Sequence, residues 1–465
     1  MSIPKAVKEI LEAQEIKYET IKVEEVFGME RLAEKLGDDS QYLLRVVGFK
    51  KANKVVMCVL PYDRVVEVKA VWQWCFSECE VLKDAELSDY FKLCDKGNFP
   101  PVPDVFDVQI LIDTYVYDLE WVIFQSGSDK SIIKMNKVNA NLLFQDCASH
   151  TFSSTPVIEG EILNSNQSDD MADDQKENFT ATRIKQRINE TFDLPAMPEI
   201  AQDIMKLRVD PGADAARLAK VVCQDPSLAA QVISWASSPY YGYQGKVTSV
   251  EVAIARVLGF DLVMNLALGI SIGKSLKVPL DGALGVREFW KRAIYAASLT
   301  EKLCAAMPVN KRPERGLIYL SGLLHNFGHL LLGHIFPPQF KLVNAMVEAN
   351  PYTTIEDLED FILGVTHEEL GAWLMTNWHM PEELITAVGN HHREENNNQH
   401  AVYSNLVLVA NQLLKRLNIG DAIGTDVSES MMELLSLDKE KLEKALQEIE
   451  ADSEALNIMA KQLVA

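Results

Sequence analysis

Residues 366–392 read THEELGAWLMTNWHMPEELITAVGNHH, and residues 319–332 read YLSGLLHNFGHLLL. Neither stretch shows the alternation of polar and apolar residues that is typical of a strand, so both predict helices. Together they contain His325, His367 and the adjacent pair His391 and His392. Histidines from separate helices of a bundle can converge as nitrogen ligands of divalent metals. The two stretches therefore predict an all-α domain with a candidate metal centre.

The helical character extends in both directions from these stretches, from residue 183 to residue 421. Apolar residues recur three and four positions apart, which indicates amphipathic helices. After residue 421 the chain predicts a helical tail, with acidic amphipathic helices from residue 428 onward. Further helices are expected at residues 215–224, 227–237, 288–306, 315–335, 355–376 and 402–417.

The first 160 residues have a different pattern. Runs of β-branched and aromatic residues at 43–49, 54–60, 108–116 and 120–127 predict strands, with short helical stretches between them. This part is expected to be an α+β domain. Residues 161–182 are polar and acidic, with almost no apolar periodicity, and we expect them to form a linker. The predicted order is an α+β domain at 1–160, a linker at 161–182, an all-α domain at 183–421 and a tail at 422–465.

The composition disfavours several classes of partner. The formal charge of −22 repels phosphate backbones and anionic lipids, so direct nucleic-acid binding is not expected. No apolar run reaches the length of a membrane span, and the N-terminus lacks the plan of a signal peptide. Seven scattered cysteines favour a reducing compartment over a disulfide framework. We expect a cytoplasmic protein.

The helical part resembles the HDOD domains, which are bacterial relatives of the HD metallophosphohydrolases. The resemblance rests on ordered motifs, which continue through the two stretches quoted first. The other motifs are LPAMPEIAQDIMKL at 194–207, VVCQDPSLAAQVISWASSPYYG at 221–242, TSVEVAIARVLGFDLVMNL at 248–266, FWKRAIYAA at 289–297 and VLVANQL at 407–413.

The resemblance implies a metal site that has lost charged ligands. Active HD enzymes carry a histidine where this chain has Arg292, an aspartate where it has Asn326, and a late aspartate whose best local match is Asn411. Replacing aspartate by asparagine keeps the shape and removes the charge that would bridge two metal ions. We therefore expect a non-catalytic signalling or regulatory scaffold.

Two alternatives remain for His325, His367, His391 and His392. In the first they are relics that hydrogen-bond to one another, to asparagine side chains or to the backbone. In the second they hold a partial divalent metal site, and no other cofactor is expected. A phosphohydrolase would need a replacement carboxylate, for which Glu368 and Glu394 are the candidates. His329, His334 and His379 are expected to be structural or solvent-facing, and Gly328 and Gly371 to permit close helix packing.

The N-terminal part resembles the YbaK-type aminoacyl-tRNA editing domains. The matching stretches are residues 42–71, 94–116 and 124–135. In that family a strand lysine and two loops shape the pocket, whereas Arg45 stands at the lysine position here. Arginine keeps the charge but does not release its proton near neutral pH, which weakens the case for deacylase chemistry. The remaining expected pocket residues are Gly97, Pro100, Pro101, Gly127 and Ser128.

The combined hypothesis is a two-domain signalling protein that binds a protein partner or a small signalling ligand. A metal-dependent phosphohydrolase and an aminoacyl-tRNA editing deacylase, whose partner would be tRNA at the N-terminal domain, are the alternatives. The sequence does not identify the partner or the oligomeric state.

Overall fold

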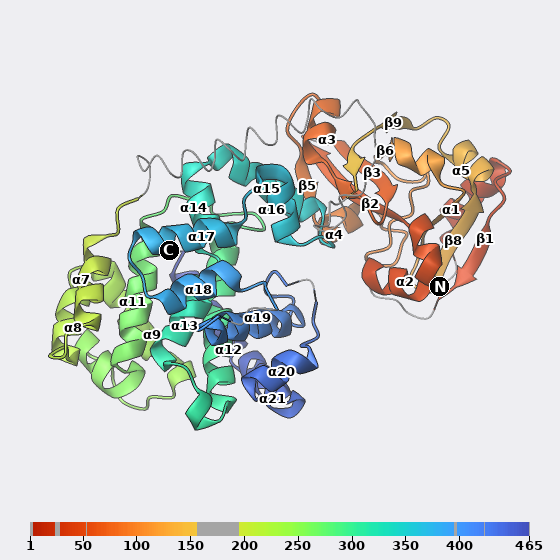
Figure 1. The fold of residues 1–465 in the computed structure, drawn as a ribbon. Helices are drawn as coiled ribbons and strands as arrows, with labels where there is room; N and C mark the ends of the chain where they lie inside the picture. The colour runs from red at the N-terminus through yellow and green to blue at the C-terminus, as the bar shows by residue number, and fades with distance from the viewer. Residues whose placement is uncertain are drawn as a thin grey trace. The chain divides into compact units, whose positions relative to one another are not determined.

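The computed structural model describes residues 3–23, 28–52, 54–155, 195–394, 398–422 and 424–464 (Figure 1). The expected linker at 161–182 and the expected start of the helical domain at residue 183 lie outside the described residues. The chain divides into two compact units. The first comprises Met1–Asn164 with Ala345–Thr353, and the second comprises Ser165–Asn344 with Thr354–Ala465.

The first unit is an α+β domain built on a five-stranded sheet with the order β5-β2-β3-β6-β9. Strands β2 and β3 form an antiparallel hairpin, while β3 pairs with β6 in parallel. A second, three-stranded sheet has the order β1-β8-β7, and β4 and β10 form a short antiparallel pair. The predicted strands and fold class are confirmed. The strands are β1 (Glu19–Lys22), β2 (Leu44–Lys51), β3 (Lys54–Pro61), β4 (Val65–Val66), β5 (Glu80–Leu82), β6 (Gln109–Asp113), β7 (Trp121–Ser128), β8 (Ser131–Asn136), β9 (Ala148–His150) and β10 (Ser153–Ser154).

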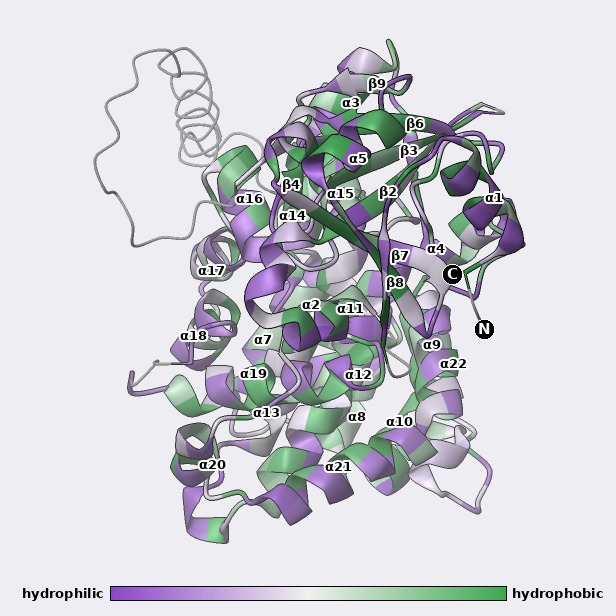
Figure 2. Ribbon diagram, turned by 90° about the vertical axis from the view of Figure 1, so that its right-hand side faces the viewer, coloured by the Kyte–Doolittle hydropathy of each residue, from purple (hydrophilic) through white to green (hydrophobic). Residues whose placement is uncertain are grey.

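Apolar side chains from both larger sheets meet in one core of this unit. Met57 of β3, Ile112 of β6 and Phe124 of β7 are buried there. The apolar character of the central strands β2, β3 and β6 is visible in Figure 2. The helices of the unit are α1 (Lys5–Ala13), α2 (Met29–Leu36), α3 (Val68–Trp74), α4 (Asp84–Leu87) and α5 (Lys137–Leu143), with short 3-10 turns η1 (Gly37–Tyr42), η2 (Ser88–Tyr90) and η3 (Thr114–Asp118).

The second unit is helical throughout its described residues, which confirms the all-α prediction. Residues after 421 continue as helices that pack against α12 rather than standing apart from it. The helices are α7 (Glu199–Arg208), α8 (Ala215–Val222), α9 (Pro226–Ala236), α10 (Val250–Ala253), α11 (Phe260–Lys274), α12 (Val286–Ala306), α13 (Arg315–Leu324), α14 (Phe327–Ile335), α15 (Pro337–Ala349), α16 (Ile355–Leu363), α17 (His367–Asn377), α18 (Glu382–Asn390), α19 (Ala401–Lys415), α20 (Glu429–Leu435), α21 (Lys439–Ala451) and α22 (Ser453–Gln462), with the short turns η4 (Pro239–Tyr241), η5 (Ile254–Leu258) and η6 (Val309–Lys311).

Local sequence signals explain where several of these helices begin. The Asp225 side chain accepts a hydrogen bond from the backbone at the start of α9, and Pro226 stands at its first position. Thr366 and Glu369 form a capping box at the start of α17. In the part of the chain that the structure describes, no helix is both long and apolar enough for a membrane span.

Helices α14 and α17 approach closely through two glycines. A Cβ atom at Gly328 would collide with the backbone carbonyl of His367, and one at Gly371 would meet Val388 at 2.5 Å. The expected role of both glycines in close helix packing agrees with this geometry. The contact fixes the start of α17, which carries His367.

We predict that Gly328→Ala destabilises the second unit by at least about 1–3 kcal/mol, because the added methyl group must push α17 away. Gly424→Ala is the control, since nothing lies within 4 Å of its Cβ position and its φ is not positive. Urea unfolding followed by far-UV circular dichroism compares the two variants. Equal stability of both would contradict the close-packing account.

Candidate functional site

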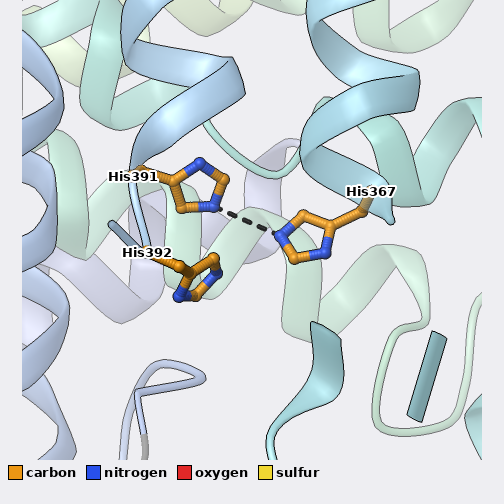
Figure 3. Close-up of side chains that lie close together, drawn as sticks. All are labelled: His367, His391 and His392. Carbon is orange, nitrogen blue, oxygen red and sulfur yellow. Dashed lines mark hydrogen bonds between the residues drawn. The ribbon is translucent and has the colours of Figure 1, made fainter. Parts of the chain in front are cut away.

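The ends of three helices bring the four predicted histidines of the second unit close together. His325 ends α13 and is followed by Asn326, which precedes α14. His367 is the first residue of α17, and His391 and His392 follow α18. Figure 3 shows the rings of His367, His391 and His392 facing one another. We call these four residues, with His329 and the carboxylates described below, the histidine cluster.

A buried carboxylate, Glu359 of α16, organises one side of the histidine cluster. It is 0% exposed and accepts hydrogen bonds from His329 Nε2 at 2.9 Å, His367 Nδ1 at 2.7 Å and the His367 backbone N–H at 2.7 Å. Burial alone would raise the pKa of the Glu359 carboxyl, but His367 and His329 outweigh burial and lower it to about 2. Burial likewise works against a charged His367, yet Glu359 leaves the pKa of His367 raised.

The His391 ring continues this network from His367. His391 Nδ1–H donates to the Val388 carbonyl at 2.8 Å, so its Nε2 atom presents a lone pair. His391 Nε2 lies 3.2 Å from His367 Nε2, which donates a hydrogen bond to it (Figure 3). The same atom lies 3.3 Å from Asn326 Oδ1. Burial, reinforced by the neighbouring histidines, lowers the pKa of His391 well below its ordinary value. His391 is therefore a neutral acceptor beside a cationic donor.

The fourth helix-end histidine has its own carboxylate. His392 Nδ1 lies 2.7 Å from Glu356 Oε1, and the His392 backbone N–H donates to Glu368. Burial opposes the charged ring, but Glu356 dominates and raises the pKa of His392 to about 10. Glu356 and Glu359 are three residues apart on α16, so one helix face supplies a carboxylate to each imidazolium.

A third carboxylate reaches the cluster from the loop after α19. Asp421 Oδ2 accepts a hydrogen bond of 2.7 Å from Asn326 Nδ2. Burial would raise the pKa of Asp421, but His392 and Arg292 hold it well below its ordinary value. The charge of Arg292 thus favours the ionised form of Asp421. His325 Nδ1–H donates to Gly322, and burial lowers the pKa of His325 to about 4.

Three atoms of this centre are buried without a hydrogen-bond partner: His325 Nε2, His392 Nε2 and Asp421 Oδ1. The lone pair of His325 Nε2 and the Asp421 oxygen are ordinary ligands of a divalent metal, whereas His392, with its pKa raised to about 10, would first have to lose the proton on Nε2. His367, His391 and His392 also offer ligand atoms within 4.8 Å of one another. The second such group, His329, Glu359 and His367, is already joined by its own hydrogen bonds. The residues therefore fit one divalent ion.

The other predicted ligand positions lie differently. Asn411 is buried on α19 with its Nδ2 atom unpartnered, and no hydrogen bond to the cluster histidines is found among the described residues. Glu394 accepts a hydrogen bond from Gln412. Of the candidate replacement carboxylates, Glu368 is the one that touches the cluster, through the His392 backbone.

Sequence reasoning missed four members of the cluster: His329, Glu356, Glu359 and Asp421. His329 was expected to be structural or solvent-facing, but it is 2% exposed and bonded to Glu359. The available signal was the spacing of Glu356 and Glu359 on a helix that ends just before His367. Asp421 lies beyond helix α19, which carries Asn411, the expected position of the late aspartate.

In the first unit, Arg45 lies at the start of β2 and is 4% exposed. Its guanidinium donates to the carbonyl oxygens of Ala349 (3.0 Å) and Arg64 (2.9 Å) and to Asn350 Oδ1 (2.7 Å). Ala349 and Asn350 belong to the segment Ala345–Thr353 of the same unit. Burial lowers the pKa of Arg45 to about 10. The guanidinium at the lysine position of the editing domains is therefore hydrogen-bonded to groups of the protein itself.

The two predicted loops of the first unit are held against each other. Gln125 of β7 donates to the Gly97 carbonyl and accepts from the Phe99 N–H. The Asp95 N–H donates to the Gly127 carbonyl, and both glycines adopt positive φ values of +78° and +89°. Pro100 and Pro101 are buried, as is Ser128. Among the described residues, no hydrogen bond joins Arg45 to either loop.

We predict that Glu359→Gln costs about 3–5 kcal/mol of stability, because it removes the charge that compensates a buried imidazolium. Asp357→Asn, on an exposed position of the same helix, should change stability by less than about 0.5 kcal/mol. Thermal and urea unfolding of both variants measure the difference. Similar small losses in the two would show that Glu359 does not stabilise the cluster.

Comparison with known proteins agrees with this organisation. A family model described as HDOD domain matches residues 194–394, and one described as aminoacyl-tRNA editing domain matches residues 23–139. The crystal structure of a protein from Marinobacter aquaeolei VT8, provisionally named a signal transduction protein, is 32% identical, with a TM-score of 0.79 and complete coverage of both chains.

Two further relatives cover part of the chain. An HDOD domain protein of unknown function from Geobacter sulfurreducens is 20% identical over 62% of this chain and 98% of its own, with a TM-score of 0.49. An uncharacterized protein of Treponema pallidum (strain Nichols) is 25% identical over 216 residues, which is 46% of this chain. The match spans 39% of that protein's length. The chain belongs to the HDOD domain proteins and carries an aminoacyl-tRNA editing domain ahead of its HDOD domain.

Proposed function

We propose that this protein is a non-catalytic signalling or regulatory scaffold of the bacterial cytoplasm, whose HDOD domain binds a protein partner or a small signalling ligand. The proposal rests on one observation: the carboxylates of Glu356 and Glu359 are bonded to histidines. Both oxygens of Glu359 accept hydrogen bonds from His329 and His367, and Glu356 is paired with His392. These carboxylates act as counterions of imidazoles.

A dinuclear hydrolase needs an anionic ligand that bridges two ions and holds them close to the attacked phosphorus. The residue after His325 is Asn326, whose neutral amide is hydrogen-bonded to Asp421. Its Oδ1 atom can serve as a ligand but cannot neutralise a second cation. A buried cluster with this charge balance favours at most one ion and a structural or ligand-sensing role.

A single divalent ion remains compatible with the cluster. Asp421 Oδ1 and the Nε2 atoms of His325 and His391 are the groups that would hold it, and His392 Nε2 would join them only after releasing its proton. Such an ion would supply Lewis-acid chemistry. The chain itself would contribute the fixed orientation of His391 through Val388 and of Asn326 through Asp421.

A metal-dependent phosphohydrolase is the second candidate, because those unpartnered buried atoms are what a catalytic ion would use. Editing activity is the weaker alternative for the first unit. The editing domains have a lysine at the position of Arg45, whereas this arginine does not release its proton near neutral pH. We therefore propose that the protein does not act on tRNA.

We predict no hydrolysis of cyclic dinucleotides above the blank rate by the full chain supplied with Mn²⁺. The double variant His391→Ala, His392→Ala should leave that rate unchanged while lowering thermal stability, because both rings are parts of the buried network. Product formation is followed chromatographically. Turnover by the natural chain that disappears in the double variant would establish the phosphohydrolase and overturn the scaffold proposal.

A further inference from the structure

The Arg45 side chain is a buried cation without an anionic partner. It is 4% exposed, and its three hydrogen-bond acceptors are the neutral oxygens of Ala349, Asn350 and Arg64. No carboxylate in the described parts of the chain lies within ion-pair distance of it. Buried charges in proteins are normally paired, since leaving one uncompensated is costly. The surroundings of Arg45 thus provide hydrogen-bond acceptors but no negative charge.

One donor of the guanidinium is also unused. Arg45 Nε is buried and has no hydrogen-bond partner, while the adjacent Nη2 donates to Asn350 Oδ1 at 2.7 Å. The Nε–Nη2 edge of an arginine matches the two oxygens of a carboxylate. A carboxylate on this edge would use the idle donor and replace a neutral acceptor with a charged one. The present hydrogen bonds of Arg45 are already assisted by the charge of the donor, so a carboxylate would add a counterion and a second, parallel hydrogen bond.

Nη2 donates to two neutral oxygens, the Arg64 carbonyl at 2.9 Å and Asn350 Oδ1 at 2.7 Å, and Asn350 is the one that supplies a side chain. Its amide also accepts from the Val66 N–H at 2.7 Å and donates to the carbonyls of Val66 and Met346. Next to it, Tyr352 packs against Tyr62, with ring centroids 5.4 Å apart. Both tyrosines are only partly buried, so they form the solvent edge of an otherwise enclosed site.

We propose that Arg45 is the centre of a binding site for a small carboxylate, which Asn350 occupies in the closed form and the ligand occupies in the open form. Binding exchanges the Asn350 amide oxygen on Nη2 for a carboxylate oxygen and fills Nε. The segment Ala345–Thr353 then loses its hydrogen bonds to Val66. This site is separate from the histidine cluster, and its test does not depend on the scaffold function.

Hydrogen–deuterium exchange on the full chain tests the site, because the Val66 N–H is bonded to Asn350 and the Val68 N–H to Met346. Acetate, phosphate and chloride are compared as potassium salts at constant ionic strength. We expect acetate to accelerate exchange in residues 64–70 by about tenfold, the change that corresponds to one displaced charge-assisted hydrogen bond. Peptides of β3 should be unaffected.

Two variants identify the residue responsible. Arg45→Met should abolish the acetate response, while Arg64→Met should retain it, because only the backbone carbonyl of Arg64 contacts Arg45. Asn350→Ala should show fast exchange without acetate. If a variant does not fold, the titration of the natural chain still decides. Exchange that ignores acetate, or that responds equally to chloride or only to phosphate, would overturn the proposal.

Discussion

The Glu359 carboxylate accepts hydrogen bonds from His329, from the His367 ring and from the His367 backbone, all away from solvent. This interaction fixes the first turn of α17 and sets the protonation of His367. His367 in turn donates to His391, whose pKa is lowered by burial and by the neighbouring histidines. The other rings have partners of their own, since Glu356 holds His392 and backbone carbonyls hold His391 and His325. The close glycine contact between α14 and α17 holds the same turn from the other side.

The charge balance is the physical basis of the scaffold proposal. In a dinuclear centre metal cations would neutralise the buried carboxylates, whereas here imidazolium groups and Arg292 do so. Asn326 has the shape of an aspartate without its charge, and its amide donates a hydrogen bond to Asp421. We propose that a bundle stabilised in this way serves recognition. The same principle, a buried charge and its compensation, distinguishes Arg45, whose charge has no counterion in the first unit.

Much of this architecture could be predicted from the sequence, because helical periodicity, strand patterns and the spacing of His325, His367 and His391 are local signals. The carboxylates were harder to predict. Glu359 becomes a ligand-like residue only through tertiary packing of α16 against α14 and α17, and Asp421 lies beyond the helix that carries Asn411. The membership of residues 345–353 in the first unit had no local signal either, since it depends on Asn350 meeting Arg45 and Val66.

The central claim is that the cluster carboxylates serve imidazoles and leave room for at most one ion. The most direct measurement is the number and position of bound Mn²⁺ ions, determined by anomalous diffraction from crystals soaked in the metal. The account predicts either no ion or a single one beside His391 and Asp421, with Glu359 still bonded to His329 and His367. Two well-occupied ions bridged by a cluster carboxylate would contradict it.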